Sequence, residues 1–210
     1  MEEHLMAKSS ENLPKTSMRS NSPEHFLLNA GAVVHNLEWS SDQWTYEEFG
    51  ATSGGSTLTL NNTLRQMEID GVFATPVGGD QVEASEGTME LNLLEYTAEN
   101  ISHALIAEVT TADGTEFPSG YNVVTPSQRV TERNYIKNLA YIGTYGESEL
   151  PIIIIFDYAI STEGISTNPQ DSTDNVITMT FSARTSPERL QDSALPVRIL
   201  VPQTNTVPGS

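Results

Sequence analysis

The chain has 210 residues and carries 28 acidic against 10 basic side chains, which gives a formal net charge of −18 and a sequence pI of about 4.3. Nucleic-acid binders take most of their affinity from Lys and Arg, so this composition argues against tight phosphate binding. The alternative is that the acidity only aids solubility. Cysteine is absent, which excludes a disulfide framework and a thiolate metal site.

The length fits one domain with tails, enough to bury roughly 70% of its unfolded surface. Residues 1–25 are polar and without periodicity, so we expect a flexible N-terminal arm there, a folded β domain over 26–201, and a flexible C-terminal tail over 202–210. We expect no secretory signal, because Met1 is followed by two glutamates. The longest wholly apolar run, residues 152–156, is far short of the roughly 20 residues of a membrane-spanning helix.

Alternating apolar and polar side chains predict half-buried strands. In chain order these are residues 56–60, 65–70, 88–94, 176–183 and 197–201. Residues 152–156 do not alternate and are mostly β-branched, which predicts a strand covered on both faces. Turns are predicted at Gly54-Gly55, Asp70-Gly71, Gly78-Gly79, Asp113-Gly114 and Asn168-Pro169. The sequence therefore predicts a mainly β fold.

Residues 97–109 are the exception and predict one helix. Thr97 can cap its start and Glu99 falls in its first turn. Its apolar stripe consists of Ile101, Ala104, Leu105 and Val109, and we expect His103 on its surface. A single helical turn is also predicted at residues 186–190, while residues 125–138 stay ambiguous.

No catalytic, cofactor-binding or metal site is predicted. The glycine-rich residues 50–57 lack the lysine of a phosphate loop and the spacing of a hydrolase elbow. The four histidines are dispersed without paired spacing, and the loop around Asp171 and Asp174 lacks the pattern of a calcium loop. Carboxylate pairs for glycoside hydrolysis stay open, because their separation in space is invisible in a sequence. We expect a chain that is not an enzyme.

Trp39 and Trp44 lie with Tyr46 and Phe49 in a segment rich in Ser, Asp and Glu. Such aromatic side chains serve as a sugar platform, as a protein contact or as core anchors. One function that follows is a β-sandwich carbohydrate-binding module on a virion or cell surface.

Six segments stand in an order that resembles the major tail tube protein of long-tailed, siphovirus-like bacteriophages. They are NAGAV (29–33), FGATSGG (49–55), EIDG (68–71), ELNLLEYTAEN (90–100), YIKNLAYIG (135–143), and PIIII (151–155) followed by DYA (157–159). The similarity covers roughly residues 26–200. The length of the N-terminal arm and an insert at residues 36–48 depart from the pattern.

The resemblance implies a β-sandwich or barrel-type fold with one flanking α-helix, assembling into hexameric rings. The rings would stack into a tube around a tape-measure protein, between tail tip and tail terminator proteins, in a virion tail assembled in the bacterial cytoplasm. DNA would pass through without specific binding, and no membrane would be involved. A conduit of this kind should repel phosphate, in agreement with the acidic composition.

The resemblance also implies roles for particular residues. Glu68, Asp70 and Glu90 are expected to face the lumen, because they fall on the polar side of adjacent alternating strands, which the family joins across subunits into one closed barrel. A predicted loop over residues 72–86 and the aromatic insert with Trp39 and Trp44 are expected to bridge successive rings. The two tails are expected to become ordered on stacking.

Overall fold

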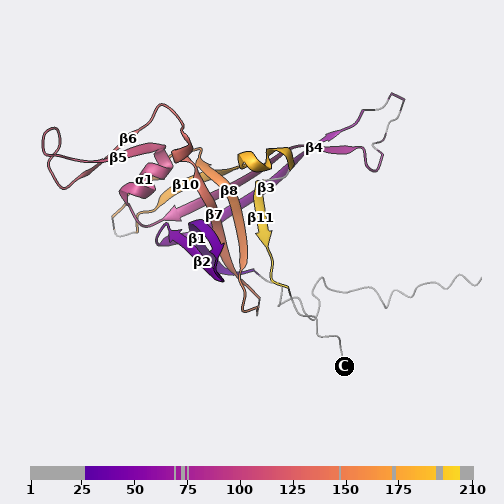
Figure 1. The fold of residues 1–210 in the computed structure, drawn as a ribbon, viewed down its shortest axis with the longest axis horizontal. Coiled ribbons are helices and arrows are strands. Elements are labelled where there is room, and N and C mark those ends of the chain that lie inside the picture. The colour runs from indigo at the N-terminus through magenta and orange to yellow at the C-terminus, as the bar shows by residue number, and fades with distance from the viewer. Residues whose placement is uncertain are drawn as a thin grey trace, which may run out of the picture.

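The computed structural model describes residues 27–203 except 69, 72–73, 75, 147, 172–173 and 193–195. The predicted N-terminal arm over 1–25 and most of the predicted C-terminal tail over 202–210 therefore lie outside the described residues. The described part is mainly β with one α-helix, which confirms the predicted fold class (Figure 1).

The described residues form eleven strands, one α-helix and two short 3-10 helices. In order they are β1 (Leu27–Ser40), β2 (Gln43–Glu48), β3 (Thr52–Gln66), β4 (Asp80–Leu93), α1 (Ala98–Leu105), β5 (Ala107–Thr111), β6 (Asn122–Pro126), η3 (Glu132–Asn134), β7 (Ile136–Tyr145), β8 (Ile152–Ser161), β9 (Ser166–Thr167), β10 (Ile177–Arg184), η4 (Pro187–Asp192) and β11 (Val197–Leu200).

Most strands form one antiparallel sheet in the order β2-β1-β7-β8-β10-β4-β3, with β11 added to β8 and β9 to β10. The sheet folds over on itself, because side chains from β1 and β7 share one core with side chains from β4 and β10. The Phe49 and Phe181 rings, for example, have centroids 5.8 Å apart. The result is a β-sandwich, and α1 closes it with the buried Ala104. Strands β5 and β6 form a separate hairpin that extends away from this body (Figure 1).

Strand β8 lies at the centre of the sheet and is buried on both faces, as its unbroken apolar run predicts. Ile154 and Phe156 point into the main core. Ile153 and Ile155 point to the opposite side, where they join a second buried cluster with Val34, Leu37 and Ala140. One edge of β8 pairs with β7, and the other edge is shared by β11 and β10.

Two sequence predictions about β3 are wrong. Gly54 and Gly55 do not form a turn between strands; they lie inside β3 with φ of +80°, where the register with β4 shifts between Thr52 and Ser56. This is a β-bulge, and glycine suits it because it adopts positive φ without a Cβ penalty. The predicted strand over 65–70 is also wrong, since β3 runs on from the bulge and ends at Gln66.

Helix α1 begins where the sequence predicts and ends one turn early. The Thr97 side chain accepts a hydrogen bond from the backbone N–H of Asn100 at 3.1 Å, which is an N-cap. Ile106 takes a left-handed conformation with φ of 54° and stops the helix, and residues 107–111 form β5 instead. The predicted helical turn at 186–190 is confirmed as the 3-10 helix η4.

Candidate functional site

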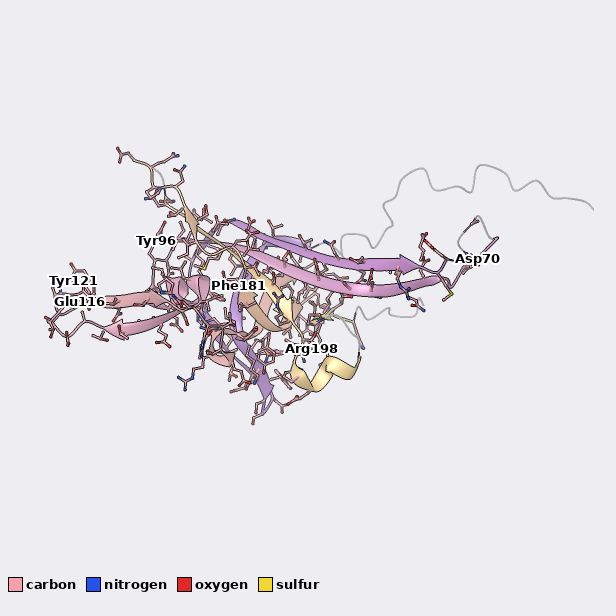
Figure 2. All side chains as sticks on the ribbon, turned by 90° about the horizontal axis from the view of Figure 1, so that it is seen from above. Asp70, Tyr96, Glu116, Tyr121, Phe181 and Arg198 are labelled. Atoms are coloured by element: carbon pink, nitrogen blue, oxygen red, sulfur yellow. The ribbon has the colours of Figure 1, made fainter. Side chains whose placement is uncertain are left out.

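Strands β3 and β4 run out of the body as a two-stranded hairpin, and its outer part, residues 61–86, is called the arm here (Figures 1 and 2). Strand β10 pairs with β4 only from Leu93 to Thr88. Beyond that point the two strands of the arm pair with each other and with no other described strand. In the described part of the chain, no further strand therefore pairs with the outer backbone edges of the arm.

One face of the arm continues the core-facing side of the sheet. Leu58 and Leu60 pack against the main core, and Leu64 lies further along the same face of β3. Opposite them, a bulge shifts the register so that Val82 pairs with Leu64 and stays on this face. Leu64 and Val82 are 56% and 58% exposed. The polar pair Asn62 and Ser85, joined by a hydrogen bond from Ser85 Oγ to Asn62 Oδ1, separates them from Leu60. Leu64 and Val82 thus form an apolar pair past the body, without cover from the described residues.

The other face of the arm is polar and acidic. Thr57 pairs with Glu90, and Asn61 pairs with Glu86. The basic side chain of this hairpin, Arg65, donates a hydrogen bond to Gln81 at 2.9 Å. Glu90 therefore lies on a polar strand face as predicted. Glu86, two pairs further out on the same face, was missed because the sequence places it in a predicted loop.

Glu68 and Asp70 lie elsewhere than predicted. Strand β3 ends at Gln66, the N–H of Met67 donates to the Gly79 carbonyl at 2.8 Å, and both carboxylates fall in the tip beyond this bond. Figure 2 shows Asp70 at the far end of the arm. The expectation that they share a strand face with Glu90 is wrong. The predicted loop over 72–86 is wrong as well, since β4 begins at Asp80, while residues 69, 72–73 and 75 lie outside the described residues.

Trp39 and Trp44 face each other across the β1–β2 hairpin. The two residues are opposite each other in the strand register, and their rings have centroids 5.0 Å apart and planes tilted by 57°. Ser41 and Asp42 connect the strands with φ of 52° and 59°, as in the tight turns that favour hairpins. The tryptophans are 56% and 39% exposed, so core anchoring is wrong for both. The two other interpretations, a sugar platform and a protein contact, remain for Trp39 and Trp44.

Two histidines that lie far apart in the sequence meet beside Phe49. The ring centroids of His35 on β1 and His103 on α1 are 5.6 Å apart, and the His35 ring lies 4.7 Å from that of Phe49. Burial lowers the pKa of both imidazoles, partly offset by the carboxylates of Glu47 and Glu99. The prediction that His103 lies on the helix surface is wrong, because its Nε2 is buried. Residue spacing gives no signal for this pair.

Among the described residues, no helix is long and apolar enough to cross a membrane. No known family model matches the chain, and no curated protein is significantly similar to it in sequence.

Proposed function

We propose that the chain is a structural subunit that polymerises through its β3–β4 arm into stacked hexameric rings, as the major tail tube protein of a long-tailed bacteriophage does. The observation that carries the proposal is the arm itself. An isolated two-stranded hairpin is only marginally stable in water and needs a further strand or a packed face. The arm lacks both among the described residues, and a second copy supplies both through strand pairing at its edges and contact with Leu64 and Val82.

Closing such arms into a ring gives the conduit a defined inner surface. With the apolar face turned to the wall, Glu86 and Glu90 line the lumen, and Glu68 and Asp70 stand at its rim. A surface of this kind repels a DNA duplex that comes within about 8 Å at physiological salt. The net charge of −18 supports a passage that does not hold phosphate.

The β1–β2 hairpin is the proposed contact between successive rings. Exposed aromatic side chains such as Trp39 and Trp44 are enriched in protein interfaces. In a virion tail the remaining partners would be the tape-measure, tail tip and tail terminator proteins.

The test is electron microscopy of the purified chain after concentration, together with its mass by light scattering. Rings or hollow tubes are expected. The double variant L64S/V82S should stay monomeric with an unchanged melting temperature, because both side chains are exposed in the subunit. T63S/A84S alters the neighbouring pair on the polar face and serves as the matched control, which should assemble normally.

A chain that remains monomeric at every concentration and binds glycans on an array would overturn the proposal. It would favour a carbohydrate-binding module that uses Trp39 and Trp44, and W39A/W44A would then abolish glycan binding. Rings formed equally well by L64S/V82S would instead show that assembly uses another surface.

The lumen assignment has its own test in assembled tubes. E86K/E90K tubes should retain double-stranded DNA fragments at low salt and release them as salt rises, whereas wild-type tubes should not retain them. E108K/E116K, on the separate β5–β6 hairpin, carries the same change of charge and should behave as wild type. Equal retention by both variants would contradict a lumen lined by Glu86 and Glu90.

A further inference from the structure

The meeting point of β1 and α1 gathers three side chains of the kind that bind metal ions. His35, Glu99 and His103 each bring one ligand atom, a ring nitrogen or a carboxylate oxygen, within 4.8 Å of the other two. Glu99 and His103 are one turn apart on α1 and therefore share a face of the helix. His35 reaches them from β1.

The elements that carry these side chains are held firmly. Asn100, between the two helical ligands, is buried and donates from Nδ2 to the Phe49 carbonyl at 2.8 Å. Ala104 anchors the next turn of α1 in the core. His35 is itself 4% exposed. Sites built on packed helices and strands keep their geometry better than sites on loops.

We infer that His35, His103 and Glu99 bind a divalent transition-metal ion of the zinc class. Zinc takes imidazole nitrogen and carboxylate oxygen at about 2.0–2.2 Å, so tetrahedral ligand atoms lie about 3.3–3.6 Å apart. Nε2 of His103 and Oε1 of Glu99 are 3.9 Å apart. The ligand atoms of the cluster, up to 4.8 Å apart, would therefore draw together on binding, and the Glu99 side chain is 68% exposed, which leaves it room to move.

The surroundings of the His35 and His103 rings favour binding of a metal ion over protonation of the imidazoles. Nε2 of His103 is buried and has no hydrogen-bond partner among the described residues, an arrangement that costs free energy unless something binds there. Burial lowers the pKa of both histidines and so favours the neutral imidazole, which is the form that ligates metals.

A further carboxylate, that of Glu47, lies next to Nδ1 of His35. Oε2 of Glu47 lies 3.4 Å from Nδ1 of His35 and accepts a hydrogen bond from Asn36 at 2.9 Å. A metal-bound imidazole usually donates its other N–H to a carboxylate, and Glu47 lies beside Nδ1 of this ring, which Asn36 Nδ2 also approaches to 3.3 Å. The ion would join α1 to β1, so its role is to stabilise the domain. This inference is independent of the proposed assembly.

The test is titration of the full chain with Zn²⁺ after treatment with EDTA, followed by calorimetry, and thermal unfolding with and without the ion. One ion per chain and a higher melting temperature are expected. E99Q and H103Q should each weaken zinc binding at least tenfold and remove most of the thermal shift. Glu99 is exposed, so E99Q leaves the fold intact even where H103Q disturbs it.

The other two histidines supply the matched control. H4Q/H25Q removes the two imidazoles outside the cluster and should keep the wild-type affinity. The imidazole NMR signals of His35 and His103 should shift together on addition of zinc. Binding that survives E99Q and H103Q, or that disappears in H4Q/H25Q, would overturn the inference, as would a chain that takes up no zinc.

Discussion

Asp157 shows how one buried charge ties three segments together. It lies on β8 with 4% exposure, and its Oδ2 accepts a hydrogen bond from Arg189 of η4. Nε of Arg198 on β11 lies 2.9 Å from Oδ1, in ionic contact but at an angle too oblique for a hydrogen bond. The backbone N–H of Asp157 donates to the Pro196 carbonyl at 3.1 Å. The residues after β10 are thus held to the central strand.

Replacing this carboxylate should weaken the domain. We expect D157N to lower the free energy of unfolding by about 1.5–3 kcal/mol, the range for hydrogen bonds to charged groups. The effect stays below that of a fully buried pair, because both arginines are partly exposed and regain water. Urea unfolding measures the change. D171N makes the same substitution at an exposed position and should leave the midpoint in place; an equal loss in both variants would contradict the role of Asp157.

The histidine pair predicts a pH dependence in metal-free protein. Burial lowers the folded-state pKa of His35 and His103 despite the facing carboxylates of Glu47 and Glu99. The unfolded chain therefore binds protons first, at about pH 6.5, and stability that is full above this pH is lost as the pH falls below it. The melting temperature in EDTA should drop between about pH 7.5 and 5.5. H103Q should flatten the drop, and a rise on acidification would contradict burial as the cause.

At the scale of elements, α1 depends on its first turn. The Thr97 side chain supplies the N-cap, and the residue it holds, Asn100, anchors Phe49. T97A should lower the free energy of unfolding by about 1 kcal/mol, the usual cost of losing a cap. Denaturant unfolding followed by circular dichroism measures it. S119A removes a hydroxyl from an exposed turn and should have no effect; the same loss in both variants would show that the cap contributes nothing.

Elements with local signals were predictable from sequence. Alternation places 88–94 and 176–183 on strands, and the β-branched run over 152–156 gives a buried strand. The predictions fail where the local backbone conformation, and not the pattern of apolar and turn residues, decides where an element ends. A Gly-Gly pair predicts a turn because glycine adopts positive φ easily, but Gly54 and Gly55 use the same positive φ to form a bulge within a strand. The end of α1 was missed because Ile106, an unfavourable residue for the left-handed region, stops it there.

The site residues were harder to predict, for a physical reason. Contacts such as His35 with His103, or Leu64 opposite Val82, depend on how the sheet folds over and on where a bulge shifts the register. A one-residue shift moves every later side chain to the other face. Sequence alternation alone placed Glu90 on the polar face, and it could not place Glu68 and Asp70, which lie past the end of β3.

At the scale of the whole molecule, charge sets a condition on assembly. Each subunit carries a formal net charge of −18, and the proposed rings would bring the acidic faces of several arms together. Added salt shortens the screening length to about 10 Å at 0.1 M and reduces this repulsion. The fraction of chain in rings or tubes should therefore rise with NaCl, as measured by light scattering. Assembly that weakens with salt would show that attractive ion pairs, and not apolar burial with strand pairing, hold the subunits together.

The position of β8 also has a consequence for how the protein is made. As the chain leaves the ribosome, β7 is available to β8 almost at once, but the partners of its other edge, β10 and β11, are synthesised only later. During that interval an isoleucine-rich strand with high aggregation tendency has an open edge. The nascent chain should therefore depend on chaperones until residues 197–200 emerge, and truncation before β11 should send it into inclusion bodies.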